Sequence, residues 1–233
     1  MDKGDQKIDS KLKNEIAKKA KQIIDVAKRE VILLEETEAA GLAEQFGLPV
    51  GKIYEAALED GICPSRYIRN RETISIPEQL KLARSCVAVI GAGGLGGHII
   101  LLLARLGFGR LIVIDHDCFD PTNLNRQALS SVDTIGKSKT EQASEVVRAI
   151  NPGVTVEGHQ TRIDESNAET ILSGADLVID ALDNIQDRFL IERIAKKLVI
   201  PMVHGAVAGF EGQIMTIFPE DDLWLGSGRE KNH

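Results

Sequence analysis

The stretch Val87-Ala88-Val89-Ile90-Gly91-Ala92-Gly93-Gly94-Leu95-Gly96-Gly97 decides the fold of this 233-residue chain. Its first four residues predict a buried strand, and Gly91, Gly93 and Gly96 fit G-x-G-x-x-G where that strand turns into a helix. Glycines there permit a tight turn and let a phosphate approach the N–H groups of the helix N-terminus. Asp115 follows about 20 residues later, at the end of the next strand, where an acid can bind ribose hydroxyls. The pattern predicts a nucleotide site; a glycine turn that only packs helix against strand is the alternative.

Short β-branched runs alternate with helical segments on both sides of this stretch. The alternation predicts an α/β fold of the Rossmann type, with a mostly parallel sheet and helices on both faces. The expected strands are 87–90, 111–114, 154–156, 177–179, 199–203 and 213–218. The expected helices are 95–106, 139–150, 167–172 and 185–197.

The chain before this domain has a different pattern. Residues 1–65 are expected to form a small helical N-terminal extension, and residues 66–233 the Rossmann domain. Apolar residues spaced by three and four predict one amphipathic helix over residues 9–38. Around Phe46-Gly47-Leu48-Pro49 a helix, a glycine turn and a second helix are expected, which resembles helix-turn-helix spacing. No arginine-rich second helix follows, so DNA reading is not favoured.

Composition excludes several classes of protein. The chain is 43% hydrophobic and 27% charged, and its formal net charge of −7 disfavours general nucleic-acid binding. It has no apolar run of about 18 residues and no secretory signal at its N-terminus, so we expect a cytoplasmic protein without membrane contact. Cys63, Cys86 and Cys118 form no CxxC pair. Neither a disulfide framework nor a zinc site is therefore expected.

Polar and cationic residues are dense in the segment after Asp115. Within about 25 residues of it lie Asp117, Asn123, Asn125, Arg126, Gln127 and Lys139, on loops expected at the carboxyl end of the sheet. Cations there can clamp a triphosphate and take up the charge that develops at its α-phosphate during attack. Hydride transfer needs no such cations, so ATP is favoured over a nicotinamide. The alternative is that Arg126 and Lys139 are ordinary surface charges.

A second polar cluster, Asp180-Ala181-Leu182-Asp183-Asn184, follows the expected strand 177–179. Asp183 can hold Mg²⁺ against phosphates, because carboxylate and phosphate oxygens are the ligands that magnesium usually takes. Asp180 can instead cap a turn, the commoner fate of an aspartate after a strand. His98, His116, His159 and His204 form no ligand spacing, so no role is assigned to them, and His204 is singled out only because it lies at a strand end near the site.

These motifs resemble the ThiF/HesA/MoeB family, the bacterial relatives of ubiquitin-activating enzymes. The resemblance covers about residues 66–220. Besides the glycine loop, the matching segments are Arg66-Tyr67-Ile68-Arg69, Ile114-Asp115-His116-Asp117, Asn123-Leu124-Asn125-Arg126-Gln127, Gly136-Lys137-Ser138-Lys139, Asn151-Pro152, Leu182-Asp183-Asn184 with Arg188, and Gly205-Ala206 through Phe210-Glu211-Gly212-Gln213.

The resemblance implies an ATP site built on the glycine loop. Gly94 would hold phosphate, and Asp115 would bind the ribose. Arg126 and Lys139 would neutralise the phosphates, with Asn123 close by, and we count Asp117 among the cofactor-binding residues.

The resemblance also implies a reaction and partners. Asp183 would organise Mg²⁺ and the reacting carboxylate. Arg69 matches an arginine that in similar proteins reaches the ATP of the other subunit, which implies a homodimer. The substrate would be a ubiquitin-like sulfur-carrier protein, whose C-terminal Gly-Gly carboxylate is adenylated with release of pyrophosphate.

Departures from the family keep alternatives open. The CxxC pairs and the later transfer cysteine of similar proteins are not found, so neither zinc nor a transfer cysteine is predicted. The domain looks short at its C-terminus, which leaves a truncated nucleotide-binding scaffold without turnover as one alternative. Another is a relative that activates a small or tRNA-borne carboxylate, although Phe210-Glu211-Gly212-Gln213 favours the ubiquitin-like partner. A hydride-transferring oxidoreductase ranks third.

Overall fold

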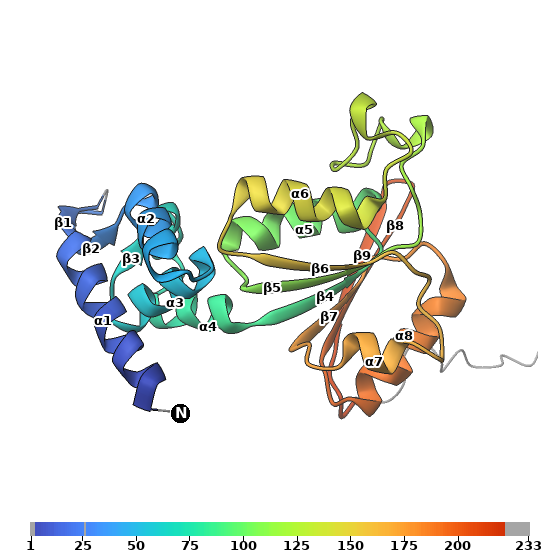
Figure 1. Ribbon diagram of the computed structural model, residues 1–233. Helices are drawn as coiled ribbons and strands as arrows, with labels where there is room; N and C mark the ends of the chain where they lie inside the picture. Colours follow the sequence, from blue (N-terminus) through green and yellow to red (C-terminus); the bar gives the residue numbers. More distant parts are fainter. Residues whose placement is uncertain (1–2, 26, 222–233) are drawn as a thin grey trace, which may run out of the picture. The chain divides into compact units, whose positions relative to one another are not determined.

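The computed structural model describes residues 3–25 and 27–221, and Figure 1 shows their fold. The chain forms two compact units. The first holds the described residues up to Arg84, with Ala104–Gly109 and Asn151–Thr155. The second holds Ser85–Leu103, Arg110–Ile150 and the described residues from Val156 onward. The first unit thus continues beyond residue 65, the expected domain boundary, which stays a prediction, and residues 222–233 of the expected domain lie outside the described part.

The second unit is built on a six-stranded sheet in the order β6-β5-β4-β7-β8-β9. Its strands are β4 (Cys86–Ile90), β5 (Arg110–Ile114), β6 (Thr155–His159), β7 (Leu177–Asp180), β8 (Met202–Ala208) and β9 (Glu211–Ile217). β4 runs parallel to β5 and β7, β7 runs parallel to β8, and the β8–β9 hairpin is antiparallel. The predicted mostly parallel sheet is confirmed.

Helices cover both faces of this sheet (Figure 1). α5 (Gly94–Leu106) and α6 (Lys139–Ile150) lie on one face, and α7 (Ala168–Leu172) and α8 (Ile185–Lys197) on the other. Every residue of β4 is buried, as expected for a central parallel strand covered on both sides. All four predicted helices are confirmed within one residue at each end.

The predicted strand 199–203 was misplaced, because β8 begins only at Met202. Val199 follows the last turn of α8 and has φ +59°, so it cannot continue an extended strand. Its apolar neighbour Ile200 is buried in the core of this unit rather than in the sheet ladder. The first residues of the apolar run 199–203 therefore follow a helix end that packs on the core. Composition alone does not distinguish such a segment from a strand.

The first unit contains α1 (Lys3–Lys19), β1 (Lys21–Ile24), β2 (Glu30–Leu34), α2 (Glu36–Phe46), α3 (Val50–Glu59), β3 (Cys63–Pro64) and α4 (Ile76–Arg84). The single helix predicted over 9–38 is wrong, because a β1–β2 hairpin occupies its second half. The side chain of Asp25 accepts hydrogen bonds from the N–H groups of Ala27 and Arg29, both at 2.9 Å. Lys28 has φ +59°. This local turn interrupts a pattern whose apolar spacing fits a helix.

The predicted helix, glycine turn and helix are confirmed in α2, Gly47 and α3. Gly47 has φ +64° and its N–H binds the last carbonyls of α2, the conformation that favours glycine at this position. α3 presents Glu55 and Glu59, which pair with Arg84. The expectation against DNA reading stays a prediction.

Hydrogen bonds between polar side chains stabilise the first unit. Tyr54 donates a hydrogen bond to Glu36 at 2.7 Å, and the Nε of Arg66 donates to the same carboxylate at 2.9 Å. Asn151, fully buried, donates to the Tyr67 hydroxyl at 2.9 Å. In the described ranges no helix combines the length and hydropathy needed for a membrane crossing.

Candidate functional site: the glycine loop and the ends of β5 and β7

Two glycines of the loop between β4 and α5 are required by packing. A Cβ on Gly96 would lie 1.7 Å from the carbonyl oxygen of Gly91, closer than any side chain can approach backbone. Gly91 has φ +93°, and a Cβ there would lie 2.9 Å from the carbonyl oxygen of Ala181. These glycines let the loop lie against the start of α5 and against the turn after β7.

Gly93 and Gly94 leave open space above the loop. The nearest atom to a Cβ on Gly93 would be Nε2 of Gln127 at 3.7 Å, and on Gly94 it would be Arg126 at 3.9 Å. Packing alone would tolerate a side chain at either position. The first N–H groups of α5 have no partner within their helix and carry its positive dipole end. This part of the loop therefore fits a phosphate, which needs close access to the backbone.

Arg126 lies beside this cradle. The Cγ of Arg126 would lie 3.9 Å from a Cβ on Gly94. Its guanidinium is exposed and Nη1 donates to the Thr122 carbonyl at 2.8 Å. This bond to the loop backbone fixes the orientation of the guanidinium and thus of its other N–H groups. The structure thus brings Arg126 and the glycine loop together, as the sequence predicted.

Lys139, the first residue of α6, is a buried cation. Only 5% of it is exposed, and its Nζ lies 2.8 Å from Asp117 and 3.9 Å from Asp115. The hydrogen bond from Lys139 lowers the pKa of the Asp117 carboxyl. Asp115, His116 and Asp117 offer ligand atoms within 4.8 Å of one another. The charge of Lys139 already compensates these acids. The cluster is therefore less suited to bind a divalent cation than an unpaired carboxylate is.

Asp115 and Asn123 hold the loops of the site in place. One carboxylate oxygen of Asp115 accepts the Ala92 N–H at 2.8 Å, and the other accepts the Asp117 N–H at 2.9 Å. Asn123, only 9% exposed, accepts the Asp120 N–H at 3.0 Å in a capping box. Both residues are therefore engaged within the protein, and their expected contacts with a nucleotide stay predictions.

Gln127 is a site residue that the sequence reasoning did not select. It is 7% exposed, and its Oε1 is buried without a hydrogen-bond partner among the described residues. Its amide lies over Gly93. An unpaired buried amide beside an open glycine cradle is the kind of group that a bound ligand can satisfy. Its position directly after Arg126, in the dense polar segment, was the available signal.

The turn after β7 carries the free carboxylate of the site. Asp183 is exposed, and no described residue forms a hydrogen bond or ion pair with its side chain. It lines a pocket of about 590 Å³ at the carboxyl edge of the sheet, where ligands of open α/β sheets bind. The pocket is lined by His116, Arg162, Asp183, Asn184, Ile185, Gln186 and Asp187. An exposed, unpaired carboxylate is the donor that Mg²⁺ takes together with water and phosphate oxygens.

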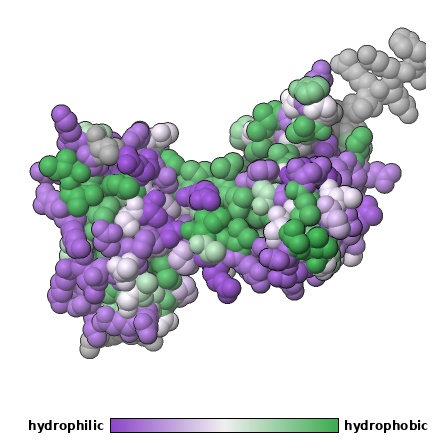
Figure 2. Space-filling model, turned by 90° about the horizontal axis from the view of Figure 1, so that it is seen from above, coloured by the Kyte–Doolittle hydropathy of each residue, from purple (hydrophilic) through white to green (hydrophobic). Residues whose placement is uncertain are grey.

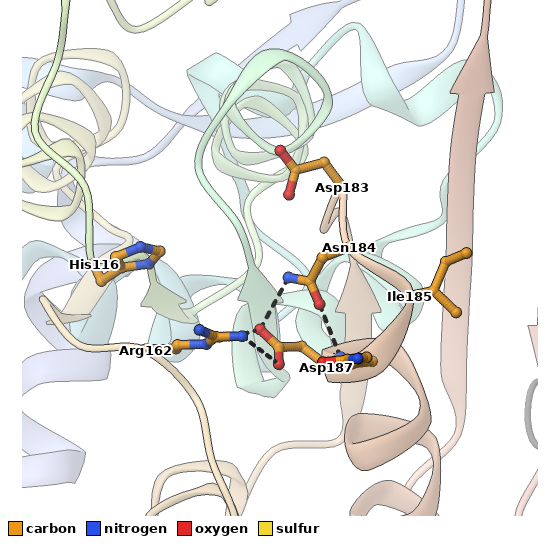
Figure 3. Close-up of a pocket in the computed structure, with 7 residues that line it drawn as sticks. His116, Arg162, Asp183, Asn184, Ile185 and Asp187 are labelled. Carbon is orange, nitrogen blue, oxygen red and sulfur yellow. Dashed lines mark hydrogen bonds and ion pairs between the residues drawn. The ribbon is translucent and has the colours of Figure 1, made fainter.

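Hydrogen bonds join three other residues of this pocket. Asn184 caps α8 by accepting the Asp187 N–H at 2.9 Å, and Arg162 binds Asp187 at 3.0 and 3.2 Å. Figure 3 shows the Asp183 carboxylate turned away from this bonded group. Burial raises the pKa of Asp187, but the hydrogen bonds from Arg162 and Asn184 outweigh it, so the net pKa lies below its ordinary value. Arg162 and Asp187 were not foreseen, because only the fold brings residues after β6 and β7 together.

Two further residues complete the account of the predictions. Asp180 accepts the Leu182 N–H at 3.0 Å, so the expected turn cap is confirmed. Arg69 lies in the first unit, is exposed, and begins the short 3-10 helix Asn70–Glu72. Its expected role at the ATP of another subunit stays a prediction.

Comparison with known proteins identifies the family. The model of the ThiF family matches residues 66–227. This chain belongs to the ThiF family. The resemblance inferred from the motifs is thereby confirmed, and the ThiF match begins at the residue where the expected Rossmann domain begins.

The ThiF-family relatives include activating enzymes. The chain is 43% identical over 142 residues to the SAMP-activating enzyme E1 of Haloferax volcanii, covering 61% of this chain and 53% of that protein. It is 40% identical over 136 residues to the sulfur carrier protein adenylyltransferase of Thermus thermophilus, covering 58% and 50%. This ThiF-family chain thus spans about half the length of these two relatives.

A solved structure of a ThiF-type neighbour contains a nucleotide. The E. coli tRNA N6-threonylcarbamoyladenosine dehydratase TcdA, in complex with ATP, superposes with a TM-score of 0.60 at 29% identity. The match covers 62% of this chain and 60% of that one. The fold of the second unit is therefore one on which ATP is bound in a similar protein.

Proposed function

We propose that this chain binds ATP with Mg²⁺ and adenylates a carboxylate, namely the C-terminal glycine of a ubiquitin-like sulfur-carrier protein. The observation that carries the proposal is the open cradle at Gly93 and Gly94, flanked by Arg126 and by the buried amide of Gln127. These groups supply N–H donors and positive charge where a triphosphate would lie. The ATP complex of the neighbouring TcdA structure supports the same assignment.

The residues present suit attack at the α-phosphorus. A carboxylate oxygen of the carrier forms a bond to the α-phosphorus. The bond from the α-phosphorus to the oxygen that bridges to the β-phosphate breaks, and pyrophosphate leaves with the electron pair. Arg126 stabilises the negative charge that grows on the phosphate oxygens, and Lys139 would contribute there by exchanging its bond to Asp117 for one to a phosphate oxygen. Asp183 would hold Mg²⁺, which neutralises further phosphate charge. The protein's part is positioning and charge stabilisation, and no covalent intermediate with a side chain is required.

The surface of the second unit favours a protein partner. Phe210 at the tip of the β8–β9 hairpin is fully exposed, and Ile214 and Val207 are 81% and 70% exposed. Leu102 on α5 is 60% exposed. Figure 2, which looks onto the layer of α5 and α6, shows apolar surface among the charged side chains there. Exposed apolar side chains of this size suit a protein partner better than a polyanion.

A tRNA-borne carboxylate is the second candidate, because the similar TcdA structures are of a tRNA-modifying dehydratase. The net charge of −7 disfavours it, since binding to a phosphate backbone relies on basic surface. A scaffold that binds ATP without turnover remains an outcome of the test below. A homodimer in which Arg69 reaches the partner's nucleotide, and a cytoplasmic location, belong to the same proposal.

The test is ATP–pyrophosphate exchange with Mg²⁺, with and without a ubiquitin-like protein that ends in Gly-Gly. We expect exchange only with the carrier. In Asp183→Ala the rate of exchange should fall by about 100-fold or more, because the negative charge of the transition state would lose the Mg²⁺ that neutralises it. The matched control is Asp133→Ala, which removes an exposed aspartate outside the site. Exchange driven by a modified tRNA would favour the second candidate. ATP binding without exchange against either substrate would refute adenylation.

A further inference from the structure

A buried pair of ionisable side chains lies directly behind the turn that carries Asp183. Asp180, the last residue of β7, is paired in register with His204 of β8. The His204 Nδ1 lies 2.7 Å from Oδ2 of Asp180, and the two side chains are 3% and 0% exposed. None of the roles proposed above uses this pair.

The pair is connected to the backbone of Leu182 on both sides. The second oxygen of Asp180 accepts the Leu182 N–H at 3.0 Å. Arg188 of α8 donates through Nη2 to the Leu182 carbonyl, and its Nε lies 3.7 Å from Oδ2 of Asp180. Both backbone polar groups of Leu182 are therefore fixed by side chains of this cluster.

Leu182 directly precedes Asp183, and Asn184 directly follows it. Asn184 is fixed in turn as the N-cap of α8, through the Asp187 N–H at 2.9 Å. The backbone of Asp183 is therefore held from both sides, while its carboxylate is exposed and has no partner among the described residues. A rigid backbone under a free side chain is the arrangement that preorganises a ligand-binding group.

A turn by itself does not require this cluster. An uncharged asparagine or serine can cap the same turn, whereas a buried carboxylate is costly unless it is paired. Here Oδ2 faces both His204 and Arg188, and this orients Oδ1 toward Leu182. His204 and Arg188 thus fix the direction of the Asp180 carboxylate, in addition to the turn that this carboxylate caps.

We propose that His204 is a positioning residue, which orients Asp180 and, through Leu182, sets where the Asp183 carboxylate meets Mg²⁺ and nucleotide. The assignment of Asp183 rests on the proposed function. The mechanical part of the proposal is that His204 fixes the Leu182 backbone through Asp180. It rests on the hydrogen bonds alone and can be tested without an activity assay.

The first measurement is hydrogen exchange of the Leu182 amide by NMR. His204→Leu removes the donor at Nδ1, whereas His204→Asn keeps a side-chain N–H close to that position. We expect the Leu182 N–H to exchange about tenfold faster or more in His204→Leu and to recover in His204→Asn. Unchanged protection of Leu182 in a folded His204→Leu protein would overturn the mechanical part of the proposal.

The second measurement is nucleotide affinity by calorimetry, with and without Mg²⁺. We expect His204→Leu to leave metal-free ATP binding within about twofold and to reduce the gain in affinity from Mg²⁺ by about fivefold or more, since only the Asp183 contact is displaced. In pyrophosphate exchange kcat should fall more than the KM for ATP changes, with recovery in His204→Asn. Equal loss of metal-free and Mg²⁺-dependent binding would show a merely structural role for His204.

The matched control is His159→Leu, because His159 bonds Glu157 at 2.8 Å on β6, away from this cluster. It should change neither Leu182 exchange nor the effect of Mg²⁺. If His204→Leu fails to fold, His204→Gln is measured instead, since its amide mimics Nε2 rather than Nδ1 and should loosen Leu182 in the same way. A wild-type protein that binds Mg²⁺ and ATP but shows no exchange would refute adenylation, while the Leu182 result would still decide the role of His204.

Discussion

In the first unit Asn151 is fully buried and makes three hydrogen bonds, whereas in the second unit the amide of Gln127 is buried and its oxygen has no partner in the part of the chain that the structure describes. Asn151 donates to the Tyr67 hydroxyl and the Ala104 carbonyl, and it accepts the Gly153 N–H. Its bonding capacity is used within the protein, so it stabilises the fold. The Oε1 of Gln127 has no partner among the described residues and lies beside the open space at Gly93, so it is free to accept a hydrogen bond from a ligand.

The glycine loop shows the same contrast within a few residues, and it yields the largest expected effect. Gly96→Ala forces a Cβ onto backbone, so we expect a loss of about 3 kcal/mol or more in unfolding free energy and loss of ATP binding. Gly93→Ala meets only ordinary contacts in the protein. It should cost less than about 1 kcal/mol and still weaken ATP binding about tenfold or more, since the new methyl occupies the cradle. Urea unfolding and calorimetric titration with ATP measure both quantities.

That comparison would fail if the two variants lost stability equally. It would also fail if Gly93→Ala bound ATP like the wild type, because the space above the loop would then not be the phosphate cradle.

The two amides can be separated by a paired substitution. Asn151→Ala leaves buried partners unsatisfied, so we expect a loss of about 2–4 kcal/mol in unfolding free energy with unchanged ATP affinity. Gln127→Met keeps the size of the side chain and removes an unpaired polar atom. Its unfolding free energy should stay within about 1 kcal/mol of the wild type, while ATP affinity falls several-fold. A destabilised Gln127→Met protein with normal ATP affinity would assign Gln127 to the fold instead.

The smallest expected effect concerns the Glu36 cluster of the first unit and depends on pH. Burial raises the pKa of the Glu36 carboxyl, but hydrogen bonds from Arg66 and Tyr54 lower it by more, so the net pKa is below its ordinary value. The stability that Glu36 contributes is therefore full above about pH 4.3, the unfolded pKa, and is lost as the pH falls through the lower folded pKa.

Glu36→Gln should accordingly destabilise the protein by about 1 kcal/mol at pH 7, a small value because more than a third of this side chain is exposed. The difference from the wild type should narrow below about pH 4. Urea unfolding of both proteins at pH 7 and pH 3.5 measures it, and a gap that widens in acid would contradict the sign.

The sequence predicted the sheet and the four helices of the second unit because each of these elements is encoded locally. Strand 86–90 is apolar throughout and α6 follows a helical period, and both patterns persist whatever packs on them. The prediction from apolar spacing failed where the same spacing fits both a helix and a strand, because neighbouring segments then decide between them. The β1–β2 hairpin has apolar spacing that also fits a helix, and only the Asp25 turn and the pairing with β3 select strands.

The candidate site divides in the same way. The glycine loop, Arg126, Lys139 and Asp183 were predicted, because their spacing after predicted strands places them at one edge of a parallel sheet. The place of Asn123 near the phosphates stays a prediction, and the structure adds that its side chain caps a 3-10 turn, a local bond that asparagine often makes. Arg162 and Asp187 were missed, since their contact joins segments far apart in the chain.

The sequence by itself determined the ThiF-type second unit, its glycine loop and the family to which the chain belongs, because strand period, glycine spacing and charged residues are all carried by neighbouring positions. Only the tertiary structure decided which polar groups are already used. It pairs Asp115 with the loop, satisfies Asn151, leaves Gln127 and Asp183 available, and brings His204 against Asp180. The physical reason is that hydrogen-bond satisfaction depends on partners from other strands and loops, which no local pattern specifies.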